Sequence, residues 1–174
     1  GWTLLNYVMD ARTGLGRFHD FTISNYDLMM KLIDYCLNHS IDEILALPDV
    51  KERVDLYFEQ QDLFKKQLKS LVKVEGKVAV IDLRNEEVIY AGNRFMVYAM
   101  YPDVEISVHV AWGFQKQNTA VMIGKSIINK ESNVNIGDIC LEYGGGGHAN
   151  AGTCQLDNDK VDAVLPKIIE KLNR

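Results

Sequence analysis

The chain has 174 residues, 47% of them hydrophobic and 25% charged, which suffices for the core of one domain, or of one domain and part of a second. A formal net charge of −5 and a pI near 5.4 argue against a broad basic face for duplex nucleic acid, so any site for a polyanion must be local. The three cysteines are widely spaced and form no CxxC pair, which indicates neither a disulfide framework nor a zinc site and fits a reducing cytoplasm.

The first residues, GWTLLNYVMDARTG, carry no targeting or membrane signal. Their apolar part is interrupted by Asp10 and Arg12 and is too short to span a bilayer, and it lacks the basic segment of a signal peptide. The chain also begins without Met, inside a segment with the pattern of folded structure. We therefore expect a piece of a longer cytoplasmic protein without a membrane partner.

The stretch up to residue 72 has helical periodicity. Ser24 is a suitable N-cap for a helix over residues 25–37, whose apolar residues recur three and four positions apart. Ser40 and Glu43 have the spacing of a capping box, which predicts a second, short helix. After Pro48 one apolar stripe faces charged residues, which predicts a long amphipathic helix over residues 49–72.

From Gly76 onward the period changes to that of extended chain. The segments KVAVIDL and EVIYAG flank the turn RNEE, and VEISVHVAWGF and TAVMIGKSII flank QKQN, so each pair predicts two adjacent strands. We further expect short helices in NRFMVYAMY and VNIGDICLEYG, a strand in AGTCQL, and a terminal helix kinked at Pro166. The predicted fold class is α/β: a mixed β-sheet flanked by helices, preceded by a helical segment and a long connector helix.

The most unusual stretch is YGGGGHANAGTCQ, in which four of the 13 glycines directly precede His148. Glycine loses more backbone entropy on folding than other residues, so a run of it needs positive φ or the close approach of another group. A helix end needs only one or two glycines, and neither a P-loop nor a GxGxxG fingerprint matches the flanking residues. A nest of backbone N–H groups beside a histidine, able to hold a phosphate, fits the pattern better.

GGGGHANAG resembles the signature loop of the C-terminal domain that is associated with DHH phosphoesterases. The residues that match the core and the close of this motif are Gly145, Gly146, Gly147, His148, Ala151 and Gly152. The preceding AVMIGKSIINKESNVNIGDICLEY is similar to the strand, loop and helix that lead into the motif, and the tail AGTCQL is similar to the exopolyphosphatase-related, nanoRNase-like branch. The resemblance implies that residues 145–148 bind substrate.

The positions of three further residues suggest that they contact the substrate. Lys125 and Ser126 fall where the family commonly has an Arg-Ser pair facing the substrate, so the resemblance implies a substrate contact for both. Lysine in place of arginine keeps the charge but loses bidentate recognition. Arg94 follows a glycine at a strand end in AGNRF, which suits a phosphate or ribose contact; an exposed arginine behind a helix N-cap is the alternative.

The catalytic half of the family binds two metal ions, usually manganese, through aspartate and histidine motifs that this chain lacks. The resemblance therefore implies Mn²⁺ or Mg²⁺ in the full-length protein, bound mainly by residues outside the chain. Asp10 resembles the last of the metal-binding aspartates; a turn residue that ends the first helix is the alternative. One carboxylate cannot hold two metal ions.

The resemblance divides the chain into residues 1–75, the helical tail of a catalytic domain with its connector helix, and residues 76–174, a substrate-binding α/β domain. The parent would hydrolyse phosphodiester or phosphoanhydride bonds in short single-stranded oligonucleotides, nucleotide phosphates or polyphosphate, and this chain alone would be inactive. The alternatives are a non-catalytic module that binds nucleotides or nucleic acid, and a regulatory domain that binds neither. The sequence leaves the oligomeric state open, with a homodimer as one candidate.

Overall fold

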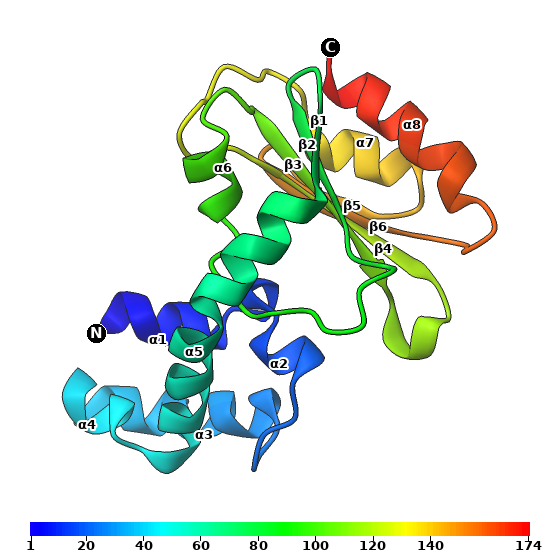
Figure 1. Ribbon diagram of the computed structural model, residues 1–174. Helices are drawn as coiled ribbons and strands as arrows, with labels where there is room; N and C mark the ends of the chain where they lie inside the picture. Colours follow the sequence, from blue (N-terminus) through cyan, green and yellow to red (C-terminus); the bar gives the residue numbers. More distant parts are fainter. The chain divides into compact units, whose positions relative to one another are not determined.

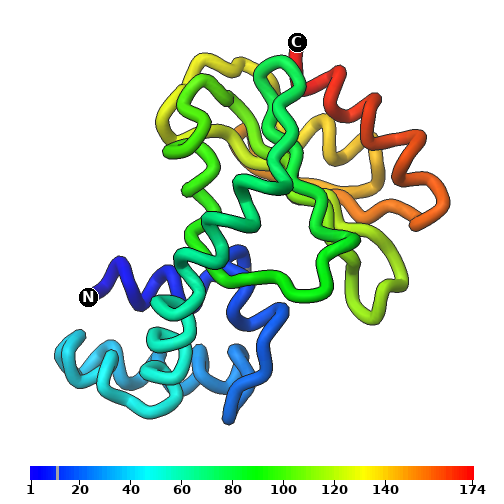
Figure 2. Tube along the Cα trace, viewed as in Figure 1, coloured from blue at the N-terminus to red at the C-terminus, as the bar shows by residue number. Residues whose placement is uncertain are grey.

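The computed structural model describes residues 1–10 and 12–174 in full, and of Ala11 only its place in a 3₁₀ turn. The contacts divide the chain into two compact units, residues 1–67 with 88–94, and residues 68–87 with 95–174. The boundary between residues 67 and 68 therefore falls within one long helix. The chain returns to the first unit at residues 88–94 and then completes the second unit. The course of the chain can be followed in Figures 1 and 2.

The first unit is built from helices around one apolar core. Its elements are α1 (Trp2–Met9), η1 (Ala11–Thr13), α2 (Leu15–Phe18), α3 (Asn25–Asn38), α4 (Ile41–Leu45) and most of α5 (Pro48–Leu71). The buried core residues are Leu5, Val8, Leu15, Leu28, Leu32, Ile44, Val50, Tyr57 and Ala91. They come from five different helices and from the returning segment, so this small unit has a core of its own.

The helix starts follow from their capping residues. The Ser24 hydroxyl accepts a hydrogen bond from the backbone N–H of Asp27 at 3.1 Å, as predicted for the N-cap of α3. Ser40 and Glu43 form the predicted reciprocal capping box at the start of α4. Helix α5 begins at Pro48, where a missing N–H costs no helical hydrogen bond.

A fully buried arginine ties α5 to the loop before α3, a feature that the sequence pattern did not predict. Arg53 donates to Asn25 Oδ1 at 3.0 Å, to the carbonyl oxygen of Asp49 at 2.6 Å and to that of Ile23 at 2.7 Å. Its guanidinium also lies 4.1 Å from the centre of the Phe21 ring. A buried charge is tolerated only with such partners, so this cluster fixes the geometry of the unit.

The second unit contains a six-stranded mixed sheet. Its strands are β1 (Val72–Glu75), β2 (Val78–Asp82), β3 (Ile106–Trp112), β4 (Thr119–Lys125), β5 (Gly146–His148) and β6 (Ala151–Leu156). The strand order is β1-β2-β3-β4-β6-β5; β2 and β3 run parallel, and the other neighbouring pairs run antiparallel. The predicted α/β class and the predicted β3–β4 hairpin are confirmed.

Helices cover both faces of this sheet. Helices α7 (Ile136–Glu142) and α8 (Val161–Leu172) pack on the face that carries Val80, Val108 and Ile123. Helix α6 (Met96–Met100) lies on the other face, where the Tyr98 hydroxyl bonds Ser107 Oγ at 2.7 Å. Figure 1 shows α6 on one side of the sheet and the pair α7 and α8 on the other.

One predicted strand is wrong. Residues 87–92, the segment EVIYAG, form no strand with β2. Two glutamine side chains of α5 instead serve as their partners: Gln67 bonds the Val88 carbonyl at 2.7 Å and the Tyr90 N–H at 3.1 Å, and Gln60 accepts from the Ala91 N–H at 2.7 Å. These bonds satisfy backbone groups that a neighbouring strand would otherwise pair. The position beside β2 that was predicted for residues 87–92 is occupied by β1.

The short 3₁₀ helix η2 (Phe114–Lys116) closes the β3–β4 hairpin, with positive φ angles of 50° at Gln115 and 56° at Lys116. Among the helices that the structure describes, none combines the length and the apolar character that a membrane span requires.

Candidate substrate-binding site

The glycine run begins as a helix terminator. Gly144 follows the C-cap of α7 with φ of +77°, a conformation that glycine adopts without the strain of a Cβ. Its N–H donates to the carbonyl of Leu141 at 3.1 Å, and the next N–H, of Gly145, donates to the carbonyl of Cys140 at 2.9 Å. Both bonds satisfy carbonyl groups at the end of α7, so the first glycine is explained by the fold.

The second and fourth glycines are explained by their packing against β6. A Cβ on Gly145 would lie 2.1 Å from the carbonyl oxygen of Thr153, and a Cβ on Gly147 would lie 2.3 Å from that of Ala151. Gly147 also has φ of +156°. Contacts this short involve backbone atoms that cannot move aside, so both positions exclude any side chain.

Gly146 is different, because the fold gives no reason for a glycine there. Its φ is not positive, and a Cβ at this position would meet no atom within 4 Å. The residue is exposed on β5, the edge strand of the sheet. Bare backbone at an exposed edge suits the close approach of something outside the chain.

The run therefore consists of a helix cap followed by a short edge strand, a geometry that differs from the expected nest of successive amides. Gly146 pairs with Thr153, Gly147 with Gly152, and His148 with Ala151. Helix α7 approaches this strand closely, because a Cβ on Gly137 would lie 2.8 Å from the carbonyl carbon of Gly147. The sequence analysis missed Gly137, although a glycine in the first turn of a helix is itself a signal of close packing.

The turn that joins β5 to β6 is held on three sides. His148 Nδ1 accepts a hydrogen bond from the backbone N–H of Asn150 at 3.2 Å. The carbonyl of Asn150 accepts from the N–H of Lys125 at 2.9 Å, and that of Ala149 accepts from the N–H of Ile136 at 3.3 Å. Since Nδ1 is an acceptor, the neutral ring of the exposed His148 carries its proton on Nε2, where it can be donated to a ligand.

Lys125 and Ser126 have different environments. The Lys125 ammonium group donates to the carbonyl of Ser132 at 3.0 Å, and its stem is half-buried at the end of β4. Ser126 is only 5% exposed, and its hydroxyl accepts the N–H groups of Ile128 and Asn129 at 3.0 Å each. The structure thus brings the Lys125 backbone to the turn that carries His148, whereas the Ser126 side chain shapes the following loop.

Asp10 and Arg94, predicted as a metal ligand and a substrate contact, lie in the first unit and pair with each other. Asp10 is the C-cap of α1 and accepts hydrogen bonds from Arg12 Nε at 2.8 Å and Arg12 Nη2 at 2.9 Å. Arg94 Nε lies 3.5 Å from the same carboxylate. Burial raises the pKa of Asp10, but the hydrogen bonds and charge of Arg12, together with the charge of Arg94, lower it below its usual value.

These residues do not fit a metal centre by themselves. In the parts of the chain that the structure describes, no three His, Cys, Asp or Glu side chains are grouped so that they could hold a metal ion. The Asp10 carboxylate is turned to two arginines. Two-metal phosphoryl chemistry needs several carboxylate or imidazole ligands, and Asp10 alone does not supply them.

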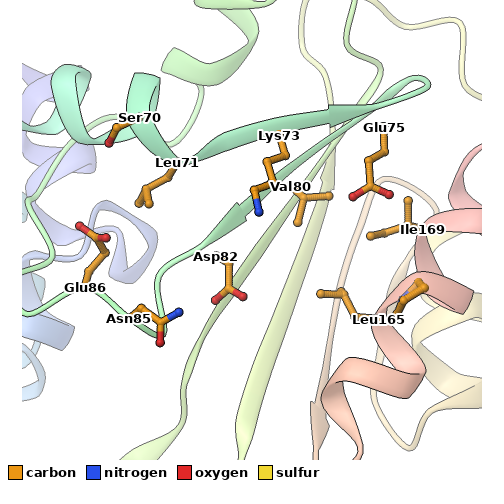
Figure 3. A pocket seen from close by; sticks show the side chains of 11 residues that line it. Ser70, Leu71, Lys73, Glu75, Val80, Asp82, Asn85, Glu86, Leu165 and Ile169 are labelled. Carbon is orange, nitrogen blue, oxygen red and sulfur yellow. The ribbon is translucent and has the colours of Figure 1, made fainter.

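A hollow of about 330 Å³ lies elsewhere in the second unit, between β1, β2 and α8. Figure 3 shows Lys73 and Asp82 on the strand side of this hollow, with Leu165 and Ile169 opposite them on α8. The Asp82 carboxylate is paired with Arg84 at 2.7 Å.

The hollow is separate from the glycine strand. Val80 lines the hollow on β2, whereas Gly147 lies on β5. Strands β3, β4 and β6 lie between them, and the strand pairing places the two residues on one line across the sheet. Four strand spacings correspond to roughly 19 Å.

A solved structure with extensive sequence identity to this chain is that of a pGpG-specific phosphodiesterase, PggH, from Vibrio cholerae. It is 58% identical over 99% of this chain, with a TM-score of 0.79. A DHH domain from a member of the s1p family of ribosomal proteins is 15% identical over 98% of this chain and 42% of its own length; its TM-score of 0.59 shows a shared fold. The chain carries a DHH-associated domain. The family suggested by the glycine motif is thereby confirmed.

The chain matches only part of the Vibrio phosphodiesterase. It spans 59% of the length of that protein. An exopolyphosphatase-related protein from Bacteroides fragilis is 16% identical over 86% of this chain and 45% of its own length, and its TM-score of 0.48 is too low to show a shared fold. No family model matches the chain, and neither does any curated protein.

Proposed function

We propose that this chain is the substrate-binding part of a phosphoesterase whose substrate is a short linear dinucleotide with a terminal phosphate. The observation that carries the proposal is Gly146, an exposed glycine that the fold does not require, two residues before His148 on the same short strand. The 58% identical relative, which is named as specific for pGpG, supports the choice of substrate.

The roles of the residues follow from their chemistry. The His148 Nε2–H and the Lys125 ammonium group are donors suited to phosphate oxygens, and hydrogen bonds to charged groups are the stronger kind. Gly146 leaves the edge of the sheet open, so that a phosphate can approach the backbone. We assign binding and charge neutralisation to these residues, and hydrolysis to a parent protein whose Mn²⁺ or Mg²⁺ is held mainly by residues outside this chain.

A titration of the 174-residue chain tests the binding role. We expect pGpG to bind measurably and GpG, which lacks the 5′-phosphate, to bind more weakly, with inorganic polyphosphate as a competitor that reports phosphate recognition alone. Equal affinity for pGpG and GpG would contradict phosphate recognition at this site. Absence of binding by every phosphorylated ligand would favour the regulatory domain instead.

A hydrolysis assay separates the binding module from a complete enzyme. We expect the chain alone to leave pGpG and bis-p-nitrophenyl phosphate intact in the presence of Mn²⁺, because the residues that the structure describes do not group into a metal centre. Hydrolysis that EDTA abolishes would show that the chain holds catalytic metal after all.

A further inference from the structure

Two exposed isoleucines lie beside the candidate site. Ile127 and Ile128 follow Lys125 and Ser126 in the loop between β4 and α7, and they are 52% and 54% exposed. Neither packs into the apolar core that the described residues of the second unit form. A single exposed apolar side chain is common on protein surfaces, whereas two neighbours next to a binding site indicate contact with an apolar group of the ligand.

Both ends of this loop, residues 126–135, are attached to the turn between β5 and β6. Before the loop, the N–H of Lys125 donates to the carbonyl of Asn150 at 2.9 Å; after it, the N–H of Ile136 donates to that of Ala149 at 3.3 Å. Consecutive Cα atoms are about 3.8 Å apart, so the Cα atoms of the two isoleucines lie within roughly 8 and 11 Å of that of Lys125. A nucleotide whose phosphate contacts Lys125 can therefore place its base on them.

Hydrogen bonds fix the course of the loop around the isoleucines. The Ser126 hydroxyl accepts from the N–H groups of Ile128 and Asn129 at 3.0 Å each, and the Ser126 N–H donates to the carbonyl of Glu105 at 2.7 Å. The Asn129 amide donates to the carbonyl of Asp103 at 3.2 Å. The two apolar side chains are thus presented on a fixed backbone, so that little ordering entropy is lost when a ligand binds.

The Lys125 ammonium group links the loop to the phosphate site. It donates to the carbonyl of Ser132, farther along the same loop, at 3.0 Å. An ammonium group has three N–H donors, so this bond leaves two for phosphate oxygens. One side chain can therefore hold the loop that carries the isoleucines and contact the phosphate at the same time.

We infer that Ile127 and Ile128 bind a nucleobase of the dinucleotide whose phosphate lies at the glycine strand. The inference rests on the proposed function and adds the base to the recognised parts of the ligand. The faces of a base are largely apolar, and removing them and the two side chains from water is favourable. A purine has two fused rings and a pyrimidine has one, so this contact favours purine over pyrimidine.

The test compares the Ile127→Ser, Ile128→Ser double variant with the wild type. Calorimetric titration should show an affinity for pGpG that is at least about tenfold lower, because the apolar contact is lost. The affinity for inorganic polyphosphate, which has no base, should not change. Both side chains are exposed, so the melting temperature should also stay nearly the same.

Val74→Ser is the matched control. Val74 is 49% exposed on β1, at the opposite edge of the sheet from β5, so its substitution should leave the affinity for pGpG unchanged. The wild type should bind pGpG more tightly than pUpU, and the double variant should lose most of this preference. A lower affinity with the same preference would contradict the purine contact.

A second readout needs no substitution. The ring current of a base shifts the NMR signals of methyl groups that contact it. The ¹³C-labelled δ1 methyl groups of Ile127 and Ile128 should therefore shift when pGpG is titrated into the wild type.

Three results would overturn the inference and leave the proposed function intact. They are an unchanged pGpG affinity in the double variant, an equal loss of affinity for pGpG and polyphosphate, and isoleucine methyl signals that stay in place when pGpG saturates the wild type. Equal affinity of the wild type for pGpG and GpG would instead contradict the proposed function, and the methyl shifts would still decide the base contact. A wild type that binds no pGpG would reject both.

Discussion

The backbone N–H of Lys125 donates a hydrogen bond to the carbonyl of Asn150, 2.9 Å away, and so joins the end of β4 to the turn behind His148. Two residues that are distant in sequence are thereby fixed at one end of the sheet. The same turn is held from the other side by Ile136 at the start of α7. This arrangement gives the glycine strand a rigid support, which a binding site for a small charged ligand requires.

Gly146→Ala and Gly147→Ala form a matched pair that separates function from folding. At Gly146 a Cβ meets nothing within 4 Å, so we expect the free energy of unfolding to change by no more than about 0.5 kcal/mol, while the affinity for pGpG falls. At Gly147 the Cβ would lie 2.3 Å from a backbone oxygen, so we expect a loss of at least roughly 1–3 kcal/mol of stability. Urea unfolding and calorimetric titration measure both, and equal stability of the two variants would contradict the packing account.

Lys125→Met keeps the aliphatic stem and removes the charge. We expect the affinity for pGpG to fall by about 1–3 kcal/mol, a factor of roughly 5 to 150, because a charge-assisted hydrogen bond is lost. The melting temperature should change little, since the bond that holds the turn comes from the Lys125 backbone.

Lys125→Arg is the control for this substitution, and it should recover part of the affinity through its retained charge. Unfolding of Lys125→Met, with binding intact in the remaining folded fraction, would instead show that the ammonium group is structural through its contact with Ser132.

His148→Asn separates the two functions of the imidazole. An asparagine oxygen can accept a hydrogen bond from the N–H two residues later, as His148 Nδ1 does from Asn150, so the turn should keep its stability. The variant has no equivalent of the Nε2–H, and we expect the pGpG affinity to decrease as strongly as in His148→Ala. An affinity equal to that of the wild type would mean that His148 acts only within the turn.

Asp10 gives a pH-dependent prediction. Because its folded-state pKa is lowered, its contribution to stability is fully present above the unfolded value of about 3.9 and is lost as the pH falls through the lower folded pKa. Asp10→Asn should therefore be less stable than the wild type at pH 6, and the difference should shrink below pH 4. Urea unfolding between pH 6 and 2.5, with Asp20→Asn as an exposed control, measures it; a difference independent of pH would contradict the ion-pair account.

Much of the fold could be predicted because its signals are local. The N-cap at Ser24, the capping box of Ser40 and Glu43, and the turn in the β3–β4 hairpin act over a few residues, and each is confirmed. The segment 87–92 was predicted incorrectly because its partners are Gln60 and Gln67 on α5. An alternating pattern in a sequence does not show whether another strand or a side-chain amide pairs with the backbone.

The candidate site was predictable only in part. The motif indicated residues 145–148 and Lys125 through a resemblance, and the structure brings them to one end of the sheet. That Gly146 differs from its neighbours, or that the Ser126 hydroxyl caps a loop, depends on contacts across β6 and within that loop. The pairing of Asp10 with Arg94 likewise depends on chain folding over a long separation, which no spacing in the sequence reveals.

The central claim is that the glycine strand, with His148 and Lys125, binds a phosphorylated dinucleotide. Amide NMR spectra of the ¹⁵N-labelled chain, recorded during titration with pGpG, test it most directly because they locate the ligand without relying on a mutation. We predict saturable shift changes concentrated at residues 145–150 and at Lys125, which GpG reproduces only weakly. Saturable changes confined to other residues, such as those lining the hollow beside α8, or no changes at all, would contradict the claim.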